Sequence, residues 1–272
     1  MYESYWQLTT KPFDGCGDAR FHYPCESQQG AMLKLRYALE NRRGAAVLAG
    51  QSGLGKTALA QTLLRQLGDA FSPRVQVVFP QLPADQLLAC LADQVTGEAS
   101  GGQSTAMQNL RRLEQNLREN HAAGKHAVIV IDEGQLLAEM QSLETIRLLL
   151  NLEQDGRPLA SFLLVGQTAL MVAVDRLPEL EERIAVKCLL RRFQIAETMG
   201  YIQHRLQAAG CQRAIFTDAA LAKIHELTHG VARRINRLCD LTLLVGFAEE
   251  RSEIGPEEVS AIADELSPAA AE

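Results

Sequence analysis

The 272-residue sequence lacks several features that would assign it to a class at once. It has no apolar run of the roughly 18 to 20 residues needed to cross a bilayer, and residues 1–12 do not have the basic start and apolar stretch of a signal peptide. Its six cysteines form no C-x2-C pair and no cluster of zinc spacing, so neither a disulfide framework nor a zinc site is expected. These absences predict a soluble, cytoplasmic protein with no transmembrane segment.

An excess of positive charge is also missing. Lysine and arginine number 27 against 33 acidic residues, which gives a net charge of -6. This balance argues against non-specific nucleic-acid binding by the whole surface, although a local basic patch is compatible with it. The 47% hydrophobic and 22% charged content is typical of a globular chain with material for one substantial core and a smaller second domain.

Short apolar runs alternate with helical patterns, which predicts an α/β domain with a parallel sheet. Five runs are expected to be strands: Ala45–Leu48, Val75–Phe79, Ala127–Ile131, Phe162–Val165 and Val186–Phe193. The last run contains Lys187, so we expect it at an edge of the sheet. Helices are expected at Ser27–Asn41, Thr57–Leu67, Pro83–Val95, Ser104–Asn120 and Met140–Gln154, with a flexible connection over Thr96–Gln103.

After about residue 195 the strand pattern stops. Four helices are expected there: Ala196–Ala209, Asp218–Thr228, Ala232–Glu249 and Pro256–Leu266. The predicted organisation is therefore an N-terminal segment (residues 1–44), an αβα core (45–195), a helical domain (196–268) and a short tail (269–272).

A phosphate-binding loop follows the first predicted strand and opens a helix. It matches G-x-x-x-x-G-K-[ST] in full, and with the next residue it comprises Gly50, Gln51, Ser52, Gly53, Leu54, Gly55, Lys56, Thr57 and Ala58. Its glycines allow a tight turn that points N–H groups and the positive end of the helix dipole at phosphates. Lys56 is expected to reach the β- and γ-phosphates of ATP, and the Thr57 hydroxyl to coordinate Mg²⁺.

Two carboxylates end the strand at Ala127–Ile131. Asp132 is expected in the magnesium shell, while Glu133 is expected to polarise the attacking water. Another strand end carries Gln167. Its amide either contacts the γ-phosphate and the lytic water or simply begins a loop, and the residues alone leave both readings open.

Longer stretches resemble the AAA+ ATPases of the ExeA/GspA type, whose members serve type II secretion and whose relatives serve pilus, exopolysaccharide or exosortase systems. The resemblance includes IDEGQLL from Ile131, LVGQ from Leu164, ERI from Glu182 and GVARRINRLCD from Gly230, together with the opening from Tyr5 to Phe21. It covers nearly the whole chain.

The resemblance implies an αβα nucleotide-binding domain with a five-stranded parallel sheet in the order 5-1-4-3-2, followed by a helical lid. It places Gln167 at the sensor 1 position, Arg183 at the arginine finger offered to a neighbouring subunit, and Arg233 at the sensor 2 position of the lid. A cation near the γ-phosphate neutralises charge in the transition state. The alternatives are a solvated helix-end charge for Arg183 and a surface role for Arg233, with Arg234 as its rival.

Two residues depart from the family pattern: Gly134 stands where alanine is usual, and Ala232 where proline is usual before the lid arginine. The first change is sterically minor, whereas the second loosens the turn that aims Arg233. Family members often continue into a transmembrane helix and a peptidoglycan-binding domain, which this sequence does not contain, so a direct hold on the cell wall is not expected.

An aromatic and apolar cluster precedes the first strand, at Phe13, Phe21, Tyr23 and Pro24. By resemblance this N-terminal segment borders the nucleotide site, where a ring would stack on adenine. The alternative is a small hydrophobic staple that packs the N-terminus onto the sheet.

Three functions are compatible with these residues. The leading one is an ATP-hydrolysing protein that assembles into a homo-oligomeric ring in an ATP-dependent manner and remodels an unidentified protein partner of the cell envelope. The second is a DNA-associated regulator of transposition type, suggested by Arg233, Arg234 and Arg237. The third is a nucleotide-gated scaffold with little turnover, against which the presence of both Asp132 and Glu133 counts.

Overall fold

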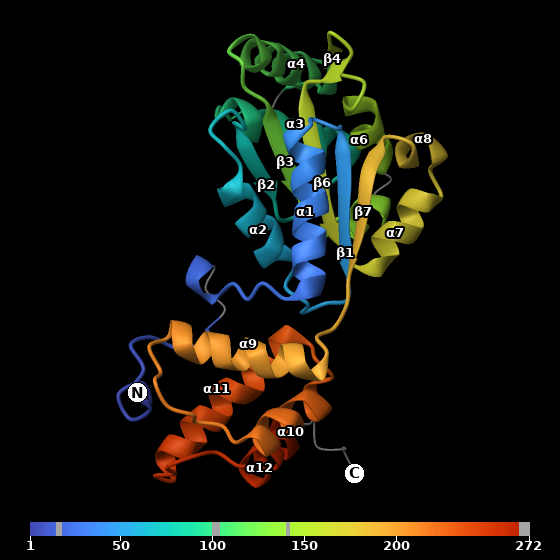
Figure 1. Ribbon diagram of the computed structural model, residues 1–272. Coiled ribbons are helices and arrows are strands. Elements are labelled where there is room, and N and C mark those ends of the chain that lie inside the picture. Colours follow the sequence, from blue (N-terminus) through green and yellow to red (C-terminus); the bar gives the residue numbers. More distant parts are fainter. Residues whose placement is uncertain (15–17, 100–103, 140–141, 267–272) are drawn as a thin grey trace. The chain divides into compact units, whose positions relative to one another are not determined.

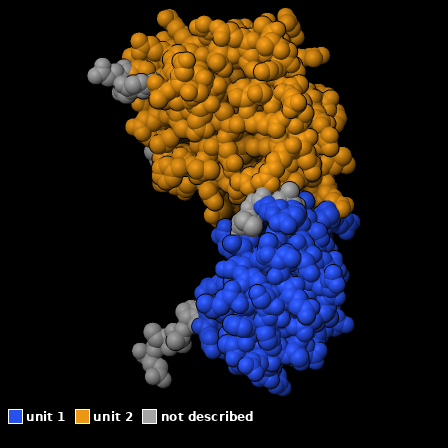
Figure 2. All heavy atoms as spheres, turned by 90° about the vertical axis from the view of Figure 1, so that its left-hand side faces the viewer, with its two compact units in different colours: residues 1–26, 53–55, 191–272 blue, residues 27–52, 56–190 orange. Residues whose placement is uncertain are grey.

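The computed structural model describes residues 1–14, 18–99, 104–139 and 142–266. The chain divides into two units (Figure 2). The sheet unit comprises Ser27–Ser52 and Lys56–Leu190, and the helical unit comprises Met1–Glu26, Gly53–Gly55 and Arg191–Glu272. The N-terminal segment predicted at residues 1–44 is thus shared between the two units. The predicted tail at residues 269–272 lies outside the described residues.

A five-stranded parallel sheet forms the centre of the sheet unit (Figure 1). Its strands are β1 (Ala45–Gly50), β2 (Arg74–Val77), β3 (Ala127–Ile131), β6 (Ala160–Gly166) and β7 (Ile184–Leu190). They lie in the order β2-β3-β6-β1-β7. Numbered within this sheet alone, the order is 5-1-4-3-2 read from β7, as the family resemblance implied. The structure differs from the predicted strands in one detail: a separate two-stranded hairpin, β4–β5, was not predicted.

The three central strands are buried at every residue. Because successive side chains of a strand point to opposite faces, complete burial means that helices cover both faces of the sheet. Edge strand β7 is more exposed, and its Lys187 Nζ lies 2.7 Å from carboxylate oxygens of Asp175 and Glu181. The charge that predicted an edge position is therefore accommodated by ion pairs at that edge.

The described part of the sheet unit has eight helices, of which the first four begin and end within two residues of the predicted bounds. They are α1 (Glu26–Glu40, whose first residue falls in the helical unit), α2 (Lys56–Gln66), α3 (Ala84–Thr96), α4 (Ala106–Ala122), α5 (Gln135–Glu139), α6 (Leu143–Leu149), α7 (Thr168–Asp175) and α8 (Pro178–Glu181). Three short helices, α5, α7 and α8, were not predicted, because segments of four to eight residues carry too little periodicity to be recognised.

The prediction of one helix over Met140–Gln154 is wrong. Helix α6 ends at Leu149, and the chain then forms the hairpin of β4 (Glu153–Gln154) and β5 (Arg157–Pro158). The two turn residues, Asp155 and Gly156, have φ values of 53° and 71°. Left-handed residues at both positions match the tight hairpin turn for which Asp-Gly is the usual sequence signal. That signal was present and was outweighed by the apolar spacing before it.

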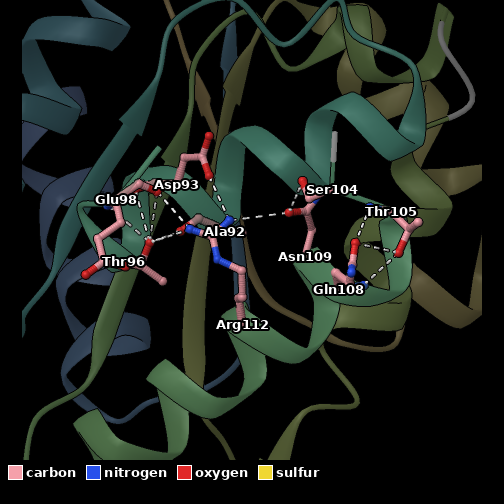
Figure 3. A network of polar contacts seen from close by, with 9 residues as sticks. All are labelled: Ala92, Asp93, Thr96, Glu98, Ser104, Thr105, Gln108, Asn109 and Arg112. Carbon is pink, nitrogen blue, oxygen red and sulfur yellow. Dashed lines mark hydrogen bonds and ion pairs between the residues drawn. The ribbon is translucent and has the colours of Figure 1, made fainter. Parts of the chain in front are cut away.

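The connection between α3 and α4 is held by one arginine (Figure 3). Arg112 of α4 donates to Asp93 Oδ1 at 3.1 Å and to the Glu98 carbonyl oxygen at 2.8 Å. At the other end of the connection, Ser104 donates to the buried Asn109 at 2.9 Å, and Thr105 caps α4. The described start of the segment predicted to be flexible is therefore fixed by Arg112, and Ser104, the residue after that segment, is bonded to α4. Residues 100–103 lie outside the described part of the chain.

The helical unit is built on four helices whose bounds differ from prediction by at most one residue. They are α9 (Ile195–Ala208), α10 (Asp218–Thr228), α11 (Ala232–Ala248) and α12 (Pro256–Leu266). The first residues of the chain belong to the same core. Trp6 is fully buried and its indole N–H donates to the Leu243 carbonyl oxygen at 2.9 Å, and the Tyr2 hydroxyl donates to Asp240.

A buried arginine fastens the next part of the N-terminal segment to α9. The Arg205 guanidinium donates to the carbonyl oxygens of Pro12 and Asp14 and lies 4.9 Å from the centre of the Phe21 ring, on the short 3-10 helix η1 (Ala19–Phe21). Phe13 and Phe21 are buried in the core of the helical unit. These are the contacts of a hydrophobic staple, but they are made within the helical unit, whereas the predicted staple was placed on the sheet. Contact of this cluster with adenine stays a prediction.

A buried histidine introduces a pH-sensitive element at the start of β3. His126 is fully buried, and its Nε2 lies 2.8 Å from Ser161 Oγ. Among the described residues, its Nδ1 has no hydrogen-bond partner. Burial, with a smaller contribution from Arg42, lowers the pKa of His126 to about 4. The folded protein thus keeps the imidazole neutral at a pH where an unfolded chain would protonate it.

We expect this residue to make the protein acid-sensitive. The stabilisation is complete above pH 6.5 and is lost as the pH falls from 6.5 toward 4, because only the unfolded state takes up the proton in that window. The loss attributable to His126 should reach at most about 3 kcal/mol. Urea unfolding of the wild type and of His126→Asn at pH 7 and pH 5 measures it. Equal pH dependence in the two proteins would contradict this assignment.

Candidate nucleotide-binding site

The phosphate-binding loop connects the end of β1 to the start of α2. Gly53 and Gly55 have φ values of 82° and 88°, a left-handed conformation that glycine adopts without strain. Lys56 is 8% exposed, and its Nζ donates to the carbonyl oxygens of Gly50 and Gln51 at 3.0 Å each. The loop thus curves around its own lysine.

The start of α11 contacts the loop within the helical unit, to which Gly53–Gly55 belong. The Arg233 N–H donates to the Gly53 carbonyl oxygen at 3.0 Å, and a Cβ on Gly53 would lie 3.0 Å from Arg233 Cβ and from a Val231 methyl. A side chain at position 53 would therefore collide with α11. The backbone of Arg233 is beside the loop although Ala232 precedes it, and the Arg233 and Arg234 side chains are both exposed.

A carboxylate at the end of β3 contacts a hydroxyl at the start of α2. The Thr57 hydroxyl at the start of α2 donates to Asp132 Oδ2 at 2.6 Å, and Asp132 is 7% exposed. Both groups are hard oxygen donors of the kind that Mg²⁺ prefers. A magnesium ion bound through phosphates and water needs only one or two protein oxygens, so this pair fits it. The described residues contain no cluster of three or more acidic, histidine or cysteine ligands.

The second carboxylate has a constrained backbone. Glu133 has a φ of 49°, and its N–H donates to Asp132 Oδ1 at 2.9 Å. A non-glycine residue in this region costs about 1 kcal/mol or more, and such strain is concentrated at functional sites. The Glu133 carboxylate is exposed and accepts a hydrogen bond from Gln135 Nε2 at 2.6 Å. Sequence reasoning gave Gln135 no role, although it lies within the motif that carried the resemblance.

Gln167 follows β6 and precedes α7. Its side chain is exposed, and its backbone N–H donates to Gln135 Oε1 at 2.9 Å. Strand β6 pairs in parallel with β1 on one side and with β3 on the other. The carboxyl ends of these three strands therefore lie side by side, and they bring together Gly50, Asp132 and Gln167. The predicted site residues of the sheet unit therefore lie together at the carboxyl ends of the strands, with a single exception.

That exception is Arg183. It immediately precedes β7, and β7 pairs with β1 so that Ile184 lies beside Ala45 and Leu190 beside Gly50. Arg183 is consequently at the amino ends of the strands, whereas the phosphate-binding loop is at their carboxyl ends. Its side chain is 37% exposed, donates to the Leu150 carbonyl oxygen at 3.4 Å, and lies 4.0 Å from Glu153. The structure does not bring it to the loop of its own chain.

The site and the sheet define a P-loop nucleotide-binding protein with the AAA+ fold. A model of the AAA domain family matches residues 39–171. The particular relationship is to General secretion pathway protein A of Aeromonas hydrophila, which is 33% identical over 271 residues and covers 98% of this chain. This match confirms the resemblance to the ExeA/GspA type. The chain spans about half, 49%, of the length of that relative.

Solved structures with a similar fold include two origin-recognition proteins. ORC2 of Aeropyrum pernix in ADPNP and ADP complexes has a TM-score of 0.73 at 19% identity, over 96% of this chain and 72% of that one. Drosophila ORC bound to DNA has a TM-score of 0.75 at 16% identity, over 98% and 67%. At these identities the likeness concerns the fold. No helix in the described part of this chain is long and apolar enough to cross a membrane.

Replacement of Lys56 with Ala should abolish ATP binding, because the phosphates lose the cation that the loop surrounds. With several charge-assisted hydrogen bonds removed, affinity should fall by at least about 100-fold. Titration with a fluorescent ATP analogue measures the loss. Lys125→Ala, which removes an exposed lysine outside the loop, is the control. Unchanged affinity in Lys56→Ala would rule out the phosphate-binding assignment.

Proposed function

We propose that this chain is a cytoplasmic, Mg²⁺-dependent ATPase whose nucleotide state controls assembly into a homo-oligomer and the remodelling of a protein partner in secretion or cell-envelope biogenesis. The observation that carries the hydrolytic part is the contact of Thr57 with Asp132, followed directly by Glu133. The secretion part rests on the similarity to General secretion pathway protein A.

In this proposal, the protein's own residues perform three tasks. The loop from Gly50 to Ala58 binds the phosphates, with Lys56 at the β- and γ-phosphates. Thr57 and Asp132 would hold a magnesium ion, which would supply neutralisation of charge on the phosphate oxygens. Glu133 takes a proton from the water whose oxygen attacks the γ-phosphorus, while the bond to the β–γ bridging oxygen breaks and ADP leaves with inorganic phosphate as the second product.

The neutral Glu133→Gln variant tests the hydrolytic step. An amide does not accept the proton, so turnover should fall by about 10² to 10⁴-fold while ATP affinity is retained. Steady-state phosphate release and analogue binding measure the two effects separately. Glu139→Gln, an exposed change on α5, is the control. Normal phosphate release by Glu133→Gln would remove this carboxylate from the mechanism.

Arg183 supports an assembly in which one subunit completes the site of the next. Arg183 lies at the amino end of the strands, and the six residues of β1 separate that end from the loop. This is a span of about 20 Å at roughly 3.3 Å per residue. An arginine side chain cannot cover that distance. If Arg183 neutralises a γ-phosphate, the phosphate belongs to a neighbouring subunit. We further propose that Arg233 of α11 is the sensor 2 arginine of its own subunit. Gln167, at the sensor 1 position, contacts the attacking water or the γ-phosphate.

Mixed assemblies test the role in trans. Arg183→Ala should bind ATP normally and lose turnover by about 10³-fold or more. Mixing it with Lys56→Ala should restore part of the activity, since an intact loop of the first subunit can then face an intact Arg183 of the second. Arg157→Ala, on β5, is the matched arginine control. No recovery in a mixture shown by sedimentation to co-assemble would mean that Arg183 acts within its own chain or only structurally.

A DNA-associated function is the second candidate. Arg233, Arg234 and Arg237 are all exposed on α11, which gives the helical unit a local basic surface despite the net charge of -6. Duplex binding that requires ATP and weakens steeply with salt would favour this candidate.

A further inference from the structure

The Gln135 side chain joins two functional strand ends. Its Nε2 donates to Glu133 Oε2 at 2.6 Å, and its Oε1 accepts the Gln167 N–H at 2.9 Å. The orientation of the amide is fixed by chemistry, because a carboxylate can only accept and a backbone N–H can only donate. One planar group must therefore carry a donor and an acceptor, and the amide of glutamine meets this requirement at this reach.

The backbone around Gln135 leaves room for this bridge. A Cβ on Gly166, the last residue of β6, would lie 2.7 Å from Gln135 Oε1 and 3.0 Å from a Leu170 methyl. Any side chain at position 166 would thus push the amide away from Gln167. The loop before Gln135 is anchored as well, since the Gly134 N–H donates to the Val165 carbonyl oxygen at 2.7 Å.

We propose that Gln135 is a positioning residue for ATP hydrolysis, which holds the Glu133 carboxylate at a fixed place relative to the end of β6. The inference rests on the proposed function, in which Glu133 accepts the proton of the attacking water. Through the bridge, a displacement of the β6 end at Gln167 is transmitted to the general base. Gln135 touches neither the phosphates nor the water in this account.

The main test compares three substitutions at one position. Gln135→Met has a similar length and makes neither hydrogen bond. Gln135→Glu keeps the acceptor for the Gln167 N–H but replaces the donor to Glu133 with a repelling oxygen. Both variants should lower kcat by about 10- to 100-fold, the usual cost of misplacing a reacting group by about an ångström. Gln135→Ala should behave like Gln135→Met. KM and the affinity for an ATP analogue should change by less than about threefold, because the phosphate-binding loop is intact.

A matched control separates the loss of the bridge from the loss of any glutamine–glutamate hydrogen bond. Gln115 Nε2 donates to Glu119 Oε1 at 2.8 Å on the exposed surface of α4. Gln115→Ala removes an equivalent bond away from the site and should keep the wild-type kcat. Gly166→Ala crowds the Gln135 amide and the Leu170 side chain while both hydrogen-bonding partners keep their chemical groups, and it should reproduce the loss of kcat. Thermal unfolding of each variant identifies any that fails to fold, and the remaining variants then decide.

The outcomes distinguish this inference from the function on which it rests. A wild-type kcat in Gln135→Glu and Gln135→Met, together with an inactive Glu133→Gln, would overturn the positioning role and leave the general base in place. Normal turnover in Glu133→Gln would overturn the proposed mechanism itself. A rise in KM with unchanged kcat in the Gln135 variants would assign the bridge to nucleotide binding and would also contradict our inference.

Discussion

Two backbone hydrogen bonds hold the end of β3, and the geometry of the site depends on them. The Asp132 N–H donates to the Val77 carbonyl oxygen of β2 at 2.8 Å, and the Gly134 N–H donates to Val165 of β6 at 2.7 Å. The chain is thus fastened to one neighbouring strand before Glu133 and to the other after it. Between these two bonds, Glu133 is held in its left-handed conformation. A Cβ on Gly134 would lie 3.2 Å from the Val165 carbonyl oxygen, so the departure from alanine relieves a close approach.

The sequence predicted most of what depends on regular burial. Strong local patterns mark the continuous apolar strands, the glycine loop and the acidic pair. The loop and the acidic pair are expected close together because the carboxyl ends of parallel strands lie on the same side of the sheet. The bounds of β3, α10 and α12 agree with prediction to the residue. The hairpin at Asp155 was missed because the apolar spacing before it continues the periodicity of α6.

Contacts between distant residues were not predictable in the same way. The bridge of Gln135 depends on a backbone N–H 32 residues away, and no spacing in the sequence reports it. The burial of Arg205 is similar, because its guanidinium donates to the carbonyl oxygens of Pro12 and Asp14. Every residue has a backbone carbonyl group, so no sequence motif marks these partners. Patterns of residue type predict elements and motifs, whereas polar pairs of this kind require the folded chain.

The burial of Trp6 has a consequence for how the chain is made. Its partner Leu243 is 237 residues further on, and Tyr2 pairs with Asp240 across 238 residues. The segment around Trp6 therefore finds its place late, because its partners on α11 are synthesised more than 230 residues after it. The strands and helices from β1 to β7 have all emerged by then and can form earlier. Until α11 emerges, the indole of Trp6 lacks its partner, so chaperone dependence during translation should concentrate on the segment around Trp6.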